Sequence, residues 1–358
     1  PPMPRVIGID PGTVSIDICG LDNGRLFLDQ SLPTADALRD PAAFVARLKE
    51  TGQVDLIVGP SGYGLPCISA ADLTDNDFRL AFLAAEGEPG GIGGLRTLLR
   101  ALARSGLPVV LTPGVVHLAS VPAHRKVNRV DMGTADKVCA VALAVQEQAE
   151  RRACAIGETA FVLLELGGAF TAAVAVQGGC IVDGLGGSSG PLGVRAAGAL
   201  DGEVAFLAGR VSKSMIFAGG FGAIAGDTDL AGSGPEVERA REAYLEGAVK
   251  AVASLRVAAP DATEVILSGR VARSVDVYED VSRRLRRLAT VSSVEVLRGI
   301  SVSAMQAAHG AALMADGLAG GAAAALIEHL GIREASGTVL DHLYVISPQH
   351  ARRTLGLV

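Results

Sequence analysis

Near the start of the chain, an aspartate stands directly before a glycine-containing turn with two hydroxyls, in the run Asp10-Pro11-Gly12-Thr13-Val14-Ser15. Backbone N–H groups of such a turn can hold phosphate oxygens. A single carboxylate beside it suits Mg²⁺, which takes few protein ligands and keeps its waters. The pattern predicts a nucleotide-binding site with Asp10 also as metal ligand. Its members would be Asp10, Gly12, Thr13 and Ser15. Taken alone, the run also fits a plain β-hairpin with a capping acid.

The same arrangement returns 155 residues later, in Glu165-Leu166-Gly167-Gly168-Ala169-Phe170-Thr171. At this offset the acid, the loop glycine and the hairpin glycine all coincide without a gap: Asp10 with Glu165, Gly12 with Gly167, and Gly24 with Gly179. The repeat predicts a second phosphate site, with Glu165 as metal ligand. Its cofactor-binding residues would be Glu165, Gly167, Gly168 and Thr171.

Each acid-and-glycine turn needs strands to position it. Alternating apolar residues predict an antiparallel three-strand meander at the start of each half, and Asp22-Asn23-Gly24 is a strong hairpin signal in the first. Strands and helices then alternate, which is typical of a layered α/β fold. We therefore expect two related lobes, residues 1–155 and 156–358. Further elements are expected as strands at 54–59, 107–112, 264–268 and 339–346, and as helices at 95–105, 135–152, 235–258 and 303–318.

A dense polar stretch, His124–Lys137, precedes the long helix expected at 135–152. Its basic residues Arg125 and Lys126 would bind an anionic substrate or stabilise a transferring phosphoryl group. Asp131 would orient or deprotonate the acceptor. These three are the predicted catalytic residues. In a purely structural reading, Thr134 caps the helix and Asp136 complements its dipole.

Two glycine-containing loops could each have one of two roles. Gly59–Pro66 follows a strand, where α/β folds place binding groups, and Gly184–Gly193 follows the second hairpin. Each would shape the acceptor pocket or serve as a plain connection.

Composition narrows the class of partner and the compartment. The chain has 358 residues, a formal net charge of −6 and a pI near 5.6, which argue against a nucleic-acid partner. An uninterrupted apolar run long enough to span a bilayer is not found, and the start lacks the pattern of a signal peptide, so we expect no membrane partner. Five scattered cysteines read as reduced thiols of a cytoplasmic protein.

These motifs together resemble the ASKHA superfamily (acetate and sugar kinases, heat-shock chaperones, actin). The runs at Asp10 and Glu165 look like its two phosphate motifs, although the second motif usually opens with Asp. Leu267-Ser268-Gly269-Arg270 looks like its adenosine motif, which implies that Gly269 and Arg270 bind cofactor. Ala308-His309-Gly310-Ala311 looks like its final connecting helix.

The resemblance implies a two-lobed, actin-like (ribonuclease H-like, duplicated) α/β fold with a nucleotide cleft between the lobes, and ATP and Mg²⁺ as cofactors. It also implies a homodimer, as is common in acetate-kinase-like relatives. More narrowly, His124–Lys137 is similar to a signature of the predicted butyrate kinase family, which implies a kinase acting on a small anionic substrate, here a carboxylate.

Two other functions fit the same motifs. One is a condensing enzyme of one-carbon cofactor biosynthesis (methanofuran or methanopterin type) that acts on a phosphorylated or pyrophosphorylated intermediate. The other is a non-catalytic nucleotide-binding protein. Binding of pyrophosphate rather than ATP would favour the first, and slow ATP turnover insensitive to small molecules the second.

Overall fold

The computed structural model describes residues 3–83 and 91–357, which divide into two compact units. Unit 1 comprises Pro1–Val130, Thr134–Gly157 and Arg298–Val358, and unit 2 comprises Asp131–Gly133 and Glu158–Leu297. The sequence-based division had placed everything after residue 155 in the second lobe. The C-terminal segment groups with unit 1 instead, because its helix packs on the first strand of the chain.

The sheet of unit 1 runs in the order β3-β2-β1-β4-β6-β5 among the described residues. β1 pairs antiparallel with β2 and parallel with β4, and β4 pairs parallel with β6. The first three strands form the predicted meander. The strand bounds are β1 (Arg5–Pro11), β2 (Ser15–Asp22), β3 (Arg25–Pro33), β4 (Leu56–Val58), β5 (Ile68–Ser69) and β6 (Val109–Leu111).

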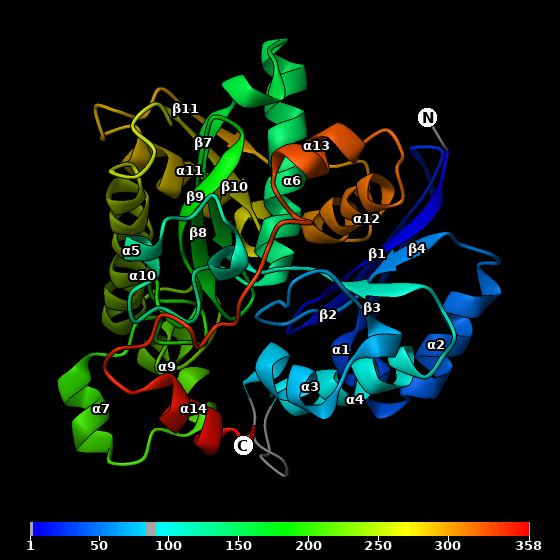
Figure 1. Cartoon of the computed structure of the whole chain (residues 1–358). Helices are drawn as coiled ribbons and strands as arrows, with labels where there is room; N and C mark the ends of the chain where they lie inside the picture. Colours follow the sequence, from blue (N-terminus) through cyan, green and yellow to red (C-terminus); the bar gives the residue numbers. More distant parts are fainter. Residues whose placement is uncertain (1–2, 84–90, 358) are drawn as a thin grey trace. The chain divides into compact units, whose positions relative to one another are not determined.

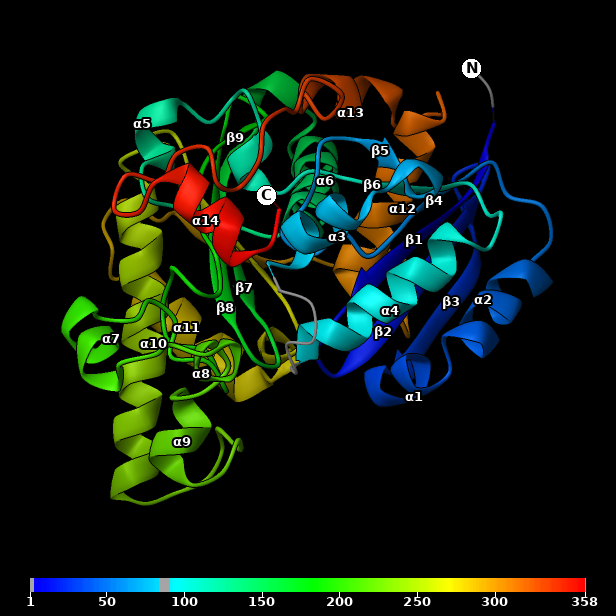
Figure 2. The same cartoon turned by 60° about the horizontal axis from the view of Figure 1, so that its bottom comes forward.

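Helices cover both faces of this sheet (Figures 1 and 2). One face carries α12, which also packs along α6, and the other carries α1, α2 and α4. The helices of unit 1 are α1 (Thr34–Arg39), α2 (Pro41–Glu50), α3 (Asp75–Phe82), α4 (Gly91–Ala103), α5 (Ala123–Lys126), α6 (Ala135–Arg152), α12 (Gln306–Leu318), α13 (Ala324–His329) and α14 (Pro348–Thr354).

Glycines allow α12 to approach both of its neighbours closely. A Cβ at Gly8 of β1 would overlap the backbone of α12 at Ala308 and Ala312. Similarly, a Cβ at Gly310 of α12 would overlap the Cys139 carbonyl of α6. The small residues of this helix therefore serve backbone-to-backbone packing, and they bind the C-terminal segment to unit 1.

Unit 2 is built around a sheet in the order β11-β10-β7-β8-β9. The long helix α10 and the amphipathic α11 lie against one face of it (Figure 1). The apolar residues of both helices are buried there. The elements of unit 2 are β7 (Ala160–Leu166), β8 (Thr171–Gln177), β9 (Cys180–Leu185), α7 (Gly202–Ala208), α8 (Lys213–Ile216), α9 (Phe221–Ala225), α10 (Pro235–Leu255), β10 (Glu264–Ser268), α11 (Val275–Leu285) and β11 (Ser293–Val296).

The 155-residue repeat extends to the backbone geometry. Both second hairpin turns place two residues in the left-handed region, with φ of 59° and 71° at Asn23 and Gly24, and 61° and 71° at Gly178 and Gly179. Both meanders also shift register at the same place, between Gly20 and Leu21 and between Ala175 and Val176. The two units thus begin with the same three-strand meander.

One expected strand is absent from the described residues: the segment 339–346 forms turns. Side chains take several of its backbone donors: Thr338 Oγ1 accepts from Leu340 N, and Asn128 Oδ1 accepts from the N–H groups of Tyr344 and Val345. The prediction of a strand at 339–346 was wrong. Val339 and Leu340 are buried, but the run does not continue as a buried strand, because Tyr344 and Val345 are 73% and 83% exposed.

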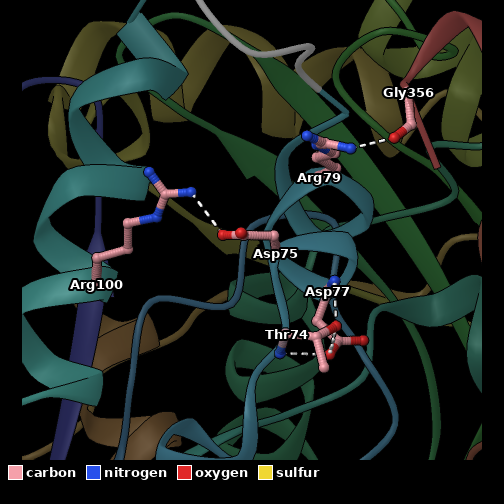
Figure 3. Close-up of polar contacts among 6 residues, drawn as sticks. All are labelled: Thr74, Asp75, Asp77, Arg79, Arg100 and Gly356. Atoms are coloured by element: carbon pink, nitrogen blue, oxygen red, sulfur yellow. Dashed lines mark hydrogen bonds and ion pairs between the residues drawn. The ribbon is translucent and has the colours of Figure 1, made fainter.

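Polar contacts fix the start of α3 and join the helix to the end of the chain (Figure 3). Thr74 and Asp77 form a capping box at its N-terminus, and Arg100 of α4 pairs with Asp75 at 2.9 Å. Arg79 then donates to the carbonyl oxygen of Gly356, beyond α14.

None of the described helices combines the length and apolar character needed to cross a membrane.

A test of the close packing is Gly310→Ala, which forces a methyl group onto the Cys139 carbonyl. We expect a loss of at least about 2 kcal/mol of stability from overpacking, despite the better helix propensity of alanine. Gly202→Ala is the matched control, because a Cβ there meets nothing within 4 Å. Thermal unfolding of both variants measures the difference, and equal melting temperatures would contradict the packing role.

Candidate functional site

The carboxyl ends of three parallel strands, β1, β4 and β6, meet at one edge of the unit 1 sheet. Loops at such an edge are where α/β folds bind ligands. Ser61 ties two of them together: its hydroxyl donates to the Gly59 carbonyl at 3.0 Å and accepts from Thr112 N at 3.0 Å. The Gly62 carbonyl accepts from Ala135 N, the first residue of α6, so that helix begins at the same edge.

Asp10 lies near the end of β1 at this edge, and the turn after it is tight. A Cβ at Gly12 would lie 2.7 Å from the Ser15 carbonyl oxygen, so a larger residue would not fit there. Thr34 Oγ1 donates to the Gly12 carbonyl at 2.7 Å and holds the turn in place. Thr13 is exposed, whereas Ser15 is buried and donates to Asp17.

The corresponding turn of unit 2 repeats this geometry. A Cβ at Gly167 would lie 2.8 Å from the Phe170 carbonyl oxygen, matching the contact of Gly12 in unit 1. Glu165, half-buried, lies beside Ser268 in the parallel β7–β10 pair. Gly269 follows with φ of +91°, and a Cβ there would lie 3.0 Å from Glu165 Cγ. The structure therefore brings Glu165, Gly167 and Gly269 together within unit 2.

Three other predicted cofactor-binding residues of unit 2 lie in different surroundings. Gly168 is half-buried in the turn, and Arg270 is exposed just after Gly269. Thr171 is fully buried at the start of β8, near the buried Tyr244 of α10. Thr171 thus contributes its hydroxyl to the core of unit 2.

Asp131 organises a glycine-serine loop of unit 2. Its Oδ2 accepts from Ser188 N and Ser188 Oγ, each at 2.9 Å, and its Oδ1 accepts from Gly133 N at 3.2 Å. Its main-chain carbonyl accepts from Gly186 N and Ser189 Oγ. Both carboxylate oxygens are thus engaged, and a Cβ at Gly186 would overlap the side chain. This geometry suits a positioning residue better than a proton acceptor.

The two basic residues expected to be catalytic lie on α5 in unit 1. Lys126 is buried, and its Nζ donates to the Leu118 carbonyl at 2.8 Å. Burial lowers the pKa of Lys126. Arg125 is half-buried. Lys126 therefore fastens α5 to the preceding loop rather than presenting its charge at the surface.

Sequence reasoning gave Thr134 a capping role and Asp136 a charge that complements the helix dipole. Asp136 does lie in the first turn of α6, but the Thr134 side chain makes no cap hydrogen bond. The two carboxylate oxygens of Asp136 contact the Lys137 ammonium and the Thr134 hydroxyl. Burial would raise the pKa of Asp136, but the Lys137 charge and the two hydrogen bonds outweigh it and hold the pKa below its usual range. The available signal was an acid and a lysine side by side in the dense polar stretch.

Asp136 and Asp10 share a neighbour, which places them at the same edge. The pKa of the Cys139 thiol is raised by burial, and then by the negative charges of Asp136 and Asp10. Thr112, the residue after β6, lies beside the same thiol. Unit 1 therefore gathers an acid after β1 and an acid–lysine pair at the start of α6 around one strand edge.

The oxygen atoms available at this edge suit a hard cation that takes few protein ligands. Asp10 supplies a carboxylate, Thr13 an exposed hydroxyl, and Asp17 of β2 has a buried carboxylate oxygen that lacks a hydrogen-bond donor. Oxygen ligands of this kind are those that Mg²⁺ prefers. No cluster of three or more His, Cys, Asp or Glu suited to a metal occurs among the described residues.

Comparison with solved structures defines the class of fold. The chain is similar to the propionate kinase of Francisella tularensis subsp. tularensis SCHU S4 (TM-score 0.61, 13% identity, covering 87% of this chain and 98% of that one). It is also similar to the acetate kinases of Entamoeba histolytica (0.59, 10%, 79% and 87%) and Porphyromonas gingivalis (0.57, 14%, 86% and 98%). At these identities the likeness establishes the two-lobed, actin-like ASKHA fold.

Within that class, the chain belongs to the family described as "Protein of unknown function (DUF1464)", whose model matches residues 8–345. No curated protein matches it in sequence.

The positioning role of Asp131 predicts an effect on backbone protection. Asp131→Ala removes the acceptor of the Ser188 amide, and we expect that amide to exchange hydrogen about tenfold faster or more, as the loss of a charged acceptor implies. Hydrogen exchange measures it. Asp227→Ala, an exposed aspartate elsewhere in unit 2, should leave Ser188 unchanged. Unaltered protection in Asp131→Ala would overturn this role.

The Asp136–Lys137 pair predicts a pH-dependent stability difference. In Lys137→Met, burial acts on Asp136 without its cation, so its pKa rises and the folded state keeps a proton that the unfolded state releases above about pH 4. The variant should lose stability relative to wild type as the pH rises from about 4 to 7, by about 3 kcal/mol.

Urea unfolding at several pH values would follow this difference. Lys250→Met makes the same change in an exposed ion pair with Glu246 and should show little effect at any pH. A deficit of Lys137→Met that is constant with pH would mean that Lys137 does not control Asp136.

Proposed function

We propose that this protein is an ATP- and Mg²⁺-dependent kinase that phosphorylates a small carboxylate. The observation that carries the proposal is the strand edge of unit 1, where Asp10 and the Asp136–Lys137 pair lie around Cys139. The turns at Gly12 and Gly167 would bind phosphate oxygens through their backbone N–H groups. The similarity of the fold to acetate and propionate kinases supports the same class of reaction.

The state of the acids favours a carboxylate acceptor over a hydroxyl. A hydroxyl must lose a proton during transfer, and an efficient base has a pKa near the working pH. The pKa of Asp136 is held below its usual range, and both oxygens of Asp131 already accept hydrogen bonds. A carboxylate arrives already deprotonated and needs no base, so it fits these acids.

Each proposed residue then has a task in positioning and charge balance. Asp10 would hold the magnesium ion, which when bound neutralises the phosphate charge. Lys137, oriented by Asp136, would place a positive charge near the transferring group. In unit 2, Glu165 and the Gly269 turn would contact the nucleotide, with Gly269 allowing close approach of the backbone.

The experiment is an acyl phosphate assay, in which hydroxylamine traps the product formed from ATP, Mg²⁺ and acetate, propionate or butyrate. We expect acyl hydroxamate with at least one of these acids, and a loss of about 100-fold or more in Asp10→Asn. Asp22→Asn is the matched control, because Asp22 lies at the other end of the same hairpin in an ion pair with Arg5. Equal turnover in Asp10→Asn would refute the assignment of the phosphate turn.

A calorimetric titration separates this proposal from a pyrophosphate-dependent condensing enzyme. The kinase is expected to bind ATP more tightly than pyrophosphate, because the base and ribose add contacts in unit 2. Tighter binding of pyrophosphate, together with no acyl hydroxamate, would favour the condensing enzyme. ATP turnover that no small acid stimulates would favour a nucleotide-binding protein without a small-molecule substrate.

A further inference from the structure

A second aspartate lies beside Asp10 on the neighbouring strand. In the antiparallel β1–β2 register, Asp17 is the direct partner of Asp10. Directly opposed residues present their side chains on the same face, a few ångströms apart. Gly8, two residues before Asp10, lies against α12, so both carboxylates belong to the face of the sheet that α12 covers.

Asp17 is a buried carboxylate with one oxygen unused. The residue is 1% exposed, and Asp10 is 9% exposed. Ser15 Oγ donates to Asp17 Oδ2 at 2.7 Å, which fixes the orientation of the group. Within the described part of the chain, Oδ1 is buried and has no hydrogen-bond donor. The Asp17 carboxylate also forms no ion pair with the described Lys, Arg or His side chains.

Such an arrangement is costly unless something neutralises it. A buried acceptor without a donor costs about 1–3 kcal/mol, and more when it is charged. A like charge directly across the strand pair adds to this cost. A divalent cation would remove both terms, because hard cations take carboxylate oxygens as ligands.

We propose that Asp17 is the second carboxylate of the Mg²⁺ site, ligating through Oδ1 beside Asp10, with Ser15 as the residue that positions it. This inference rests on the proposed function, because it gives Asp10 the same metal ion. It adds that unit 1 carries two protein carboxylates for the metal, so it should bind a divalent cation before any nucleotide arrives.

A competing way to neutralise Asp17 is a proton shared with Asp10. Asp17→Asn distinguishes the two, because its amide N–H₂ can donate to Asp10 as a protonated carboxyl would, but it removes a metal-ligating charge. With a shared proton, the asparagine variant would bind metal as wild type does. With a metal site, it would lose that binding.

The experiment is calorimetric titration of Mn²⁺ and Mg²⁺ into the chelator-treated full chain without nucleotide. We expect one saturable site per chain in wild type and none measurable in Asp17→Asn. Ser15→Ala, which keeps the carboxylate but removes its orienting hydrogen bond, should bind about tenfold more weakly. Asp22→Asn should bind as wild type does. Melting temperatures in chelator verify that each variant is folded.

No saturable binding to the wild-type chain, or equal affinity in Asp17→Asn, would overturn the inference. The acyl phosphate assay keeps this outcome apart from the proposed function. If wild type makes acyl phosphate but Asp17→Asn binds metal normally, only the role of Asp17 fails. If the metal site behaves as expected but no acid is phosphorylated, the kinase proposal fails and the metal site stands.

Discussion

The close approach of α12 to β1 and α6 is the constraint on which the rest of unit 1 depends. Gly8 and Gly310 remove the side chains that would hold these backbones apart. Since α6 begins at the carboxyl edge of the sheet, this packing also fixes where its first turn lies relative to Asp10. Helix α12, which begins at residue 306, is therefore part of the framework that supports the first phosphate turn.

The charged residues near this framework fall into two groups: some hold loops and helices in place, and others lie where they could bind a ligand. Lys126 and Asp131 are charged residues in a polar stretch, yet their polar atoms are taken up by a main-chain carbonyl and by loop donors. Asp136 and Lys137 pair with each other at the helix start, beside the strand edge. Asp10 and Asp17 are direct partners across two antiparallel strands, and like charges placed so close destabilise each other.

The two units contain the same turn geometry but carry different side chains beside it. Both turns crowd a glycine against a carbonyl three residues on, at Gly12 and at Gly167, and both meanders close with the same left-handed pair. Unit 1 carries aspartates on both strands of its first hairpin, whereas unit 2 carries a glutamate opposite Ala172. The duplicated backbone has thus diverged at the positions where ligands would be bound.

The sequence by itself determined the elements whose signals are local. Alternating strands, the Asn23-Gly24 turn and the long helix α6 all follow from residues within a few positions of one another. The repeat predicted the two-lobed fold because the same local device occurs twice. Only the tertiary structure decided that residues 298–358 join unit 1, that 339–346 is not a strand, and that Asp136 and Asp10 both lie near Cys139. These depend on contacts between distant residues, whose burial and partners no local pattern encodes.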